Sequence, residues 1–153
     1  MTGLNSETAT ASSDTTSGGR RSVRVLLFSD DRSIRDSVRL AVGRRPAPDV
    51  EVESWLECAT APAVIDAVRS GRVDMLVLDG EAAPLGGLGL CRQLKHEVFD
   101  CPPVIVLTGR PQDAWLASWS YADAAVSQPF DALTMAEALV DVARALPGDS
   151  AGH

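Results

Sequence analysis

The sequence predicts an α/β fold in which five parallel strands form one doubly wound sheet with helices on both faces. Five short apolar runs alternate with five segments whose apolar residues recur at helical spacing. Several of the runs are uninterrupted, which is typical of strands buried on both faces of a parallel sheet. Right-handed connections between such strands place helices on both sides, and 153 residues suffice for one domain of this kind.

The expected strands are apolar runs bounded by turn residues, and in chain order they are Val23–Ser29, Val50–Trp55, Met75–Asp79, Pro103–Thr108 and Ala124–Ser127. The first and third are continuous, so both are expected to be buried on both faces of the sheet. The second alternates apolar and polar residues, which indicates a more exposed strand. The fourth follows a pair of prolines that breaks the preceding segment, and the fifth is short.

The expected helices lie between these strands, over residues 30–43, 61–71, 89–98, 112–122 and 131–146. The first two end at Gly43 and Gly71, because glycine commonly ends a helix. The last is long and amphipathic, and its Leu, Val and Ala stripe is expected in the core. The domain therefore spans 21–146, between a disordered Ser-, Thr- and Ala-rich tail over 1–20 and a short tail over 147–153.

Charge and composition argue against several classes of partner. The net charge is −7, whereas binding to nucleic acid or to anionic lipid depends on clustered Lys and Arg. No apolar run approaches the roughly 20 residues that cross a bilayer, and the N-terminal residues lack a secretory signal. Cys58, Cys91 and Cys101 are widely spaced and are expected as reduced thiols. We expect a cytoplasmic protein without nucleic-acid or membrane partners.

Polar residues follow three of the predicted strands directly. Asp30 and Asp31 come after the first strand, Asp79 ends the third, and Thr108 ends the fourth. In a doubly wound sheet, ligands bind beyond the carboxyl ends of the strands, and clustered carboxylates suit Mg²⁺. The alternative is that Asp30 and Asp31 only cap the next helix and that Asp79 is a turn residue.

These residues occur in a pattern that resembles the receiver domain of bacterial two-component response regulators, which has a (βα)5 flavodoxin-like fold. The resemblance covers about residues 23–146 and rests on "FSDDRS", "MLVLD", "VIVLT", "SQPF" and the helix "GLGLCRQLK". It implies that Asp79 accepts a phosphoryl group from a histidine kinase or phosphotransfer protein. It also implies that Thr108 then hydrogen-bonds a phosphoryl oxygen. Mg²⁺ would be held by Asp30, Asp31, Asp79 and the backbone carbonyl of Glu81.

Three positions depart from the pattern of that family, and one of them is Ala83 in place of a proline, with Pro84 one residue later. Gln128 stands where the family has a lysine, so a neutral amide replaces a permanent cation. Ala125 stands where the family usually has an aromatic residue that reports phosphorylation. The resemblance therefore favours a phosphorylated single-domain response regulator, and the alternative is a pseudo-receiver that binds a partner protein without phosphorylation. In both, we expect no output domain and expect the chain to act through protein contacts.

An enzyme is a further alternative, and we do not expect one. A Mg²⁺-dependent phosphatase of the haloacid dehalogenase type would have Asp-x-Asp at its first strand, which this sequence lacks. Trp115 and Trp119 stand four residues apart on the expected fourth helix. They are either core residues or anchors for a partner, on the surface formed in receivers by the fourth helix, fifth strand and fifth helix.

Overall fold

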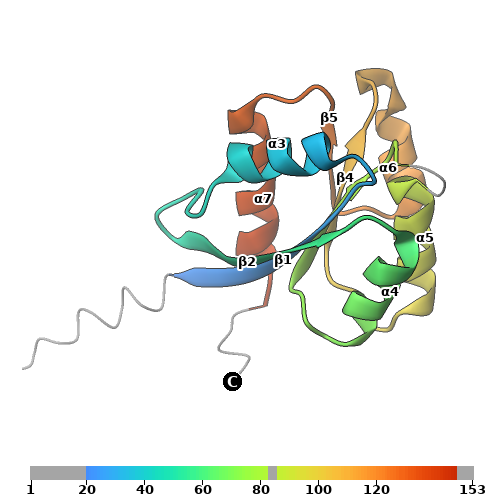
Figure 1. Cartoon of the computed structure of the whole chain (residues 1–153), viewed down its shortest axis with the longest axis horizontal. Coiled ribbons are helices and arrows are strands. Elements are labelled where there is room, and N and C mark those ends of the chain that lie inside the picture. Colours follow the sequence, from blue (N-terminus) through green and yellow to red (C-terminus); the bar gives the residue numbers. More distant parts are fainter. Residues whose placement is uncertain (1–19, 83–85, 148–153) are drawn as a thin grey trace, which may run out of the picture.

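Five parallel strands form one sheet in the order β2-β1-β3-β4-β5, and helices cover both of its faces (Figure 1). The computed structural model describes residues 20–82 and 86–147. The predicted α/β doubly wound fold is confirmed. Apart from Arg20 and Pro147, the two predicted tails lie outside the described residues, and so do Ala83 and Pro84.

The strands are β1 (Arg21–Phe28), β2 (Val50–Cys58), β3 (Met75–Asp79), β4 (Val104–Thr108) and β5 (Ala124–Ser127). The helices are α3 (Arg32–Val42), α4 (Ala61–Arg69), α5 (Gly87–Glu97), α6 (Ala114–Ser120) and α7 (Ala132–Ala145), with a 3-10 turn, η1 (Pro111–Asp113), before α6. Strands β3 and β4 are buried at every position, as their uninterrupted apolar runs predict. Strand β2 lies at an edge of the sheet, which explains its alternating pattern.

Two apolar layers hold the helices against the sheet. Helices α3 and α7 pack on one face, and α4, α5 and α6 pack on the other (Figure 1). Successive residues of β1 serve different layers, since Leu27 joins the α3/α7 core while Leu26 and Phe28 join the opposite one. The apolar stripe of α7, with Met135 and Leu139 fully buried, lies in the core as predicted.

Strand β1 pairs with β2 on one side and with β3 on the other. The direction in which successive strands are added to the sheet therefore reverses at β1. Phe28 pairs with Cys58 of β2 and with Leu78 of β3, which aligns the carboxyl ends of the three strands. Helix α5 begins directly against the end of β3. A Cβ atom at Gly87 would lie 2.7 Å from the backbone oxygen of Asp79, so only glycine permits this approach. These contacts define the edge of the sheet where a site is expected.

The two ends of the domain are joined by a hydrogen bond. The Nη1 atom of Arg21, the first residue of β1, donates to the backbone oxygen of Leu146 at 2.9 Å, just after α7. No helix among residues 20–82 and 86–147 is long and apolar enough to span a membrane.

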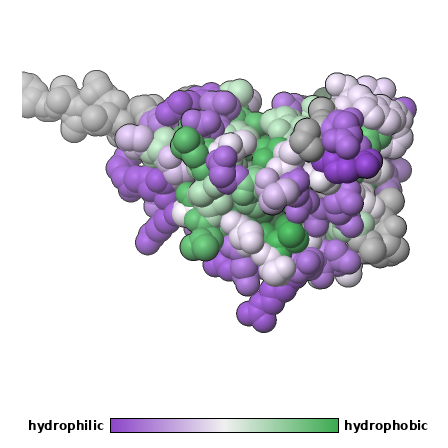
Figure 2. Space-filling model, turned by 90° about the horizontal axis from the view of Figure 1, so that it is seen from above, coloured by the Kyte–Doolittle hydropathy of each residue, from purple (hydrophilic) through white to green (hydrophobic). Residues whose placement is uncertain are grey.

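Large apolar side chains are exposed on both helix layers. Leu40 and Leu133 are exposed on the α3/α7 side, and Phe99, Trp115, Trp119 and Tyr121 are exposed on or next to α5 and α6. Seen from above, hydrophobic residues gather in the middle of one face and hydrophilic residues border them (Figure 2).

Candidate functional site

Asp79, the last residue of β3, is buried and satisfied by neutral donors. Its Oδ2 atom accepts a hydrogen bond from Ser29 Oγ at 2.8 Å. Its Oδ1 atom accepts one from Gln128 Nε2 at 3.1 Å and one from the backbone N–H of Glu81 at 2.9 Å. Only 3 % of Asp79 is exposed. The carboxylate therefore joins the ends of β1, β3 and β5 through hydroxyl and amide groups.

Ser29 is the residue of this site that the sequence analysis did not single out. Because Phe28 pairs with Leu78, the next residue along β1 lies beside Asp79. Ser29 is fully buried, and its hydroxyl also accepts a hydrogen bond from the backbone N–H of Asp31 at 3.0 Å. The predicted strand Val23–Ser29 could have indicated this role, because its last residue, Ser29, lies at the carboxyl edge of the sheet where the site was expected.

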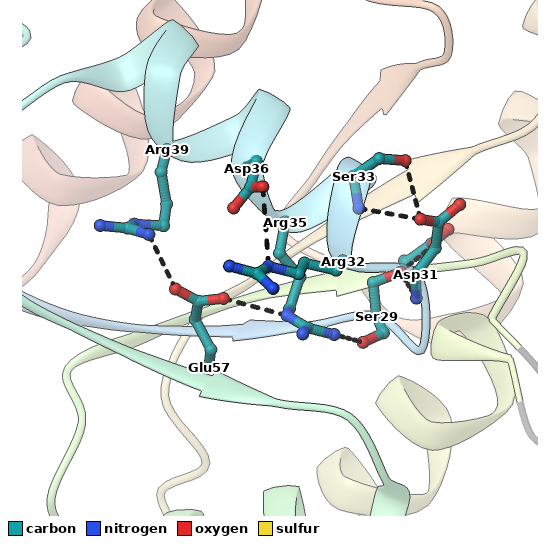
Figure 3. Close-up of polar contacts among 9 residues, drawn as sticks. Ser29, Asp31, Arg32, Ser33, Arg35, Asp36, Arg39 and Glu57 are labelled. Atoms are coloured by element: carbon teal, nitrogen blue, oxygen red, sulfur yellow. Dashed lines mark hydrogen bonds and ion pairs between the residues drawn. The ribbon is translucent and has the colours of Figure 1, made fainter.

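The acidic pair after β1 lies farther out than the resemblance implies. Asp30 and Asp31 are both exposed. Asp31 caps helix α3, because its Oδ1 accepts from the backbone N–H of Ser33 at 2.9 Å and from the Ser33 hydroxyl at 2.7 Å (Figure 3). The side-chain and backbone hydrogen bonds from Ser33 hold the pKa of Asp31 below its ordinary value. The capping alternative thus describes Asp31.

Within residues 20–82 and 86–147, no group of three or more His, Cys, Asp or Glu side chains is placed to hold a metal ion. Asp30, Asp31 and Asp79 consequently do not form one ligand group. The groups that face the Asp79 carboxylate are hydrogen-bond donors, whereas Mg²⁺ requires several oxygen ligands. These side chains therefore do not by themselves form a three-carboxylate site, and a Mg²⁺ ion held here would complete its shell with carbonyl oxygens and waters.

Thr108 and Gln128 both reach the same edge of the sheet. Thr108 is buried at the end of β4, and its Oγ1 lies 3.3 Å from Ser127 Oγ of β5. The backbone N–H of Gln128 donates to the backbone oxygen of Thr108 at 2.8 Å, which continues the pairing of β4 and β5. This pairing brings the Gln128 side chain to Asp79. The neutral amide therefore contacts the carboxylate that the resemblance pairs with a lysine.

The positive side chain of Arg35, near this edge of the sheet, hydrogen-bonds to the backbone and not to Asp79. Nη1 of Arg35 in α3 donates to the backbone oxygen of Ser29 at 2.6 Å, and its Nε donates to Glu57 of β2 at 3.0 Å (Figure 3). Arg39 binds the other oxygen of Glu57 at 3.0 Å. None of the ion pairs among the described parts of the chain includes Asp79. Arg35 therefore anchors the Ser29 segment and leaves Asp79 without a charged partner.

The two tryptophans of α6 are exposed. Trp115 is 66 % and Trp119 is 45 % exposed, so neither is a core residue. The guanidinium carbon of Arg92 in α5 lies 4.7 Å from the centre of the Trp119 ring. Trp119 thus contacts α5, on the other side of α6 from the predicted docking surface.

Comparison with known proteins identifies relatives over most of the chain, although no protein-family model matches it. It is 46 % identical over 123 residues to the uncharacterized response regulatory protein Rv3143 of Mycobacterium tuberculosis (strain ATCC 25618 / H37Rv), which covers 80 % of this chain and 92 % of that protein. It is 36 % identical over 89 residues to the response regulator MprA of Mycobacterium bovis (strain BCG / Pasteur 1173P2), which covers 58 % of this chain and 36 % of that protein.

Solved structures share the fold. The signal receiver domain of the putative response regulator NarL from Mycobacterium tuberculosis superposes with a TM-score of 0.65 at 18 % identity, covering 82 % of this chain and 98 % of that one. The receiver domain of the Francisella response regulator 1452 has a TM-score of 0.65 at 16 % identity, covering 80 % of this chain and 97 % of that one.

Proposed function

Because this chain belongs to the response regulators and its described residues form a receiver domain, we propose that it acts in signal transduction through protein contacts that do not require phosphorylation of Asp79. The observation that carries the proposal is the hydrogen bonding of Asp79. Ser29, Gln128 and the backbone N–H of Glu81 donate to both carboxylate oxygens, and all three donors are neutral.

Phosphorylation of a carboxylate brings a second negative group onto the first. Such a step is fast only where cations or a metal offset the repulsion in the transition state. The Gln128 amide still donates to the charged carboxylate, but it adds no positive charge, and a charge-assisted contact of a cation is worth about 1.5–3 kcal/mol. Exchanging a cation for the Gln128 amide therefore costs on the order of tenfold in rate. Ser29 adds a second neutral group at the carboxylate, so Asp79 is better suited to hold three strand ends together.

A second candidate function is that Asp79 is the phosphoacceptor of a single-domain response regulator, with a histidine kinase or phosphotransfer protein as donor. It is favoured by the position of Asp79 at the carboxyl edge of the sheet, near Thr108. It is also favoured by the fact that Oδ2 accepts a single hydrogen bond, from the Ser29 hydroxyl. Mg²⁺ would then be held by Asp30, Asp31, Asp79 and the Glu81 carbonyl, and the acidic side chains would have to move to reach it.

Labelling with a small phosphodonor separates the two functions. Folded wild-type protein, Asp79→Asn and the double variant Ser29→Asp/Gln128→Lys are incubated with acetyl phosphate and Mg²⁺, and the bound phosphoryl group is measured by intact-protein mass spectrometry. We expect the wild type to be labelled at least about tenfold more slowly than the double variant, and near the background that Asp79→Asn sets. The double variant places a carboxylate and a cation beside Asp79 and is expected to gain labelling. Stoichiometric labelling of wild-type Asp79 would favour the second function.

A further inference from the structure

A cluster of one guanidinium and three rings lies on the surface between α5 and α6. The guanidinium carbon of Arg92 is 4.7 Å from the ring centre of Trp119 and 5.0 Å from that of Tyr121. Its Nη1 atom donates to the backbone oxygen of Trp119. The His96 ring packs edge-on against Tyr121, with centres 5.3 Å apart. We call Arg92, His96, Trp119 and Tyr121 the aromatic–guanidinium cluster.

The cluster is held in place although its rings are exposed. Trp119 is 45 % and Tyr121 is 51 % exposed. Tyr121 ends α6 with a φ of 67°, a left-handed conformation that costs about 1–2 kcal/mol for a residue with a Cβ and that glycine usually occupies. His96 and Arg92 both belong to α5, and a hydrogen bond of 2.9 Å between His96 Nδ1 and the backbone oxygen of Arg92 fixes the orientation of the His96 ring. A surface tyrosine in a strained conformation needs contacts of this kind to persist.

Among the described residues, Arg92 has no ion-pair partner, although the chain is acidic. By contrast, Lys95 forms an ion pair with Asp123, and Arg69 forms one with Glu97. Arg92 takes part in none of the ion pairs that the structure describes for residues 20–82 and 86–147, although the net charge of the chain is −7. A guanidinium has five N–H donors, and the bond to Trp119 uses one of its nitrogen atoms. Donors therefore remain for a carboxylate.

We propose that the aromatic–guanidinium cluster is the docking site for a segment of a partner protein that carries one carboxylate among apolar residues. A carboxylate of the segment pairs with Arg92, and an adjacent apolar side chain packs on the exposed rings of Trp119 and Tyr121. Charge-assisted contacts to arginine and packing on aromatic anchors are the strongest contributions at such surfaces. Because the rest of the chain is acidic, a segment with one carboxylate among apolar residues fits better than a run of acids.

This inference rests on the proposed function only in that both have the chain act through protein contacts. It assigns those contacts to the α5 side of α6, where Trp119 meets Arg92, and not to the surface formed by α6, β5 and α7. Its test reads the Trp119 ring and not the labelling of Asp79, so the two proposals fail separately.

The probe is a capped tripeptide of leucine, glutamate and phenylalanine, and the control peptide has glutamine in place of glutamate. The chain has three tryptophans, so the indole N–H signals of Trp55, Trp115 and Trp119 can each be followed by NMR during titration of the full chain. We expect the glutamate peptide to shift the Trp119 signal with a Kd at least about tenfold lower than the glutamine peptide, as a charged contact allows. The Trp55 signal on β2 is expected to stay unchanged.

Arg92→Gln should abolish the difference between the two peptides, and Arg92→Lys, which keeps the charge but loses the planar donors, should reduce it. Arg72→Gln serves as the matched control, because Arg72 is exposed and lies outside the cluster. The proposal is overturned if both peptides shift Trp119 equally, if neither does, or if the difference persists in Arg92→Gln. A Trp119 signal that moves on dilution of the protein alone would also overturn it, because the occupant would then be a second copy.

Discussion

Ser29 and Gln128 determine the chemistry of the Asp79 carboxylate because they are the side chains that touch it. A buried carboxylate must be satisfied by donors, and here a hydroxyl and an amide supply them without supplying charge. Through these two hydrogen bonds the Asp79 carboxylate at the end of β3 links the segments that follow β1 and β5. A site with the same backbone but a carboxylate and a cation at these two positions would have a different electrostatic balance.

Ser29→Ala is expected to lower the free energy of unfolding by about 1–3 kcal/mol, because it leaves a buried carboxylate oxygen without its donor. Urea unfolding followed by circular dichroism measures the loss. Ser22→Ala is the control, since Ser22 is exposed and makes a 3.4 Å contact to Glu53, and a change below about 0.5 kcal/mol is expected there. Equal losses in both variants would mean that the Ser29 hydroxyl contributes little.

The candidate site was only partly predictable from the sequence. Asp79, Thr108 and Gln128 meet at one edge because parallel strands align their ends, and their place was expected. Ser29 was missed because the register between β1 and β3 decides which residue faces Asp79, and a single sequence does not contain that register. Asp31 could cap a helix or face a ligand, and only the start of α3 at Arg32 decides between them.

At the scale of whole elements, the close approach of α5 to β3 is a consequence of Gly87. A Cβ atom there would lie 2.7 Å from the backbone oxygen of Asp79 and 2.9 Å from the backbone carbon of Leu78. Backbone atoms cannot move aside as a flexible side chain can. Gly87→Ala is therefore expected to cost about 1–3 kcal/mol of unfolding free energy through overpacking, measured by urea unfolding.

Gly71→Ala is a matched control for that substitution. Gly71 has a φ of 74° and open space around it, so its replacement strains the backbone at a distance from Asp79. Both variants should lose stability, but only Gly87→Ala should shift the backbone amide NMR signals of Gly80, Glu81 and Gln128. Unchanged signals in Gly87→Ala would show that α5 is not held in place by this contact.

Strands β1 and β3 are also clamped near the start of β3 by an ion pair. Both oxygens of Asp74 accept side-chain hydrogen bonds from Arg24, at 3.0 and 3.1 Å. Burial raises the pKa of Asp74. The hydrogen bonds and positive charge of Arg24 lower that pKa by more than burial raises it, so it lies below its ordinary value of 3.8. The stability that this provides is present above pH 3.8 and is lost as the pH falls through the pKa of the folded protein.

We therefore expect wild type to lose more stability than Asp74→Asn between about pH 5 and about pH 2.5. Urea unfolding of both proteins at several pH values in this window measures the difference. Other carboxylates, among them Asp49 beside Arg144, have lowered pKa values and titrate in both proteins, so only the difference reports on Asp74. A difference that stays constant across the window would contradict the expectation.

The order and type of the elements were predictable because the apolar patterns are long and regular. The bounds of β3 and β5 agree with the expected ranges, whereas β2 continues three residues further, to Cys58. That extension pairs with β1 through Phe28 and Cys58, a tertiary contact that the local pattern does not contain. The expected helix over 112–122 is divided into η1 and the shorter α6, which ends at the left-handed Tyr121.

At the scale of the whole molecule, the two buried layers protect the cysteines unequally. Cys58 and Cys91 are buried, and Cys101 is half-buried. Burial raises the pKa of Cys91 to about 11 and also raises those of Cys58 and Cys101, so little thiolate is present at neutral pH. Iodoacetamide should therefore modify Cys101 first and the other two only after unfolding. Peptide mass spectrometry at increasing urea checks the order, and early modification of Cys91 would contradict it.

The hydrogen bond between Arg21 and Leu146 places the start of β1 next to the end of α7, so the two ends of the domain are close together. A permuted gene that joins these two ends through a flexible linker, and opens the chain between the exposed residues Gly71 and Arg72, should retain every strand pairing. The new termini would then lie at the amino-terminal side of β3, away from Asp79. Such a permutant would let fluorescent reporters be attached far from the Asp79 edge.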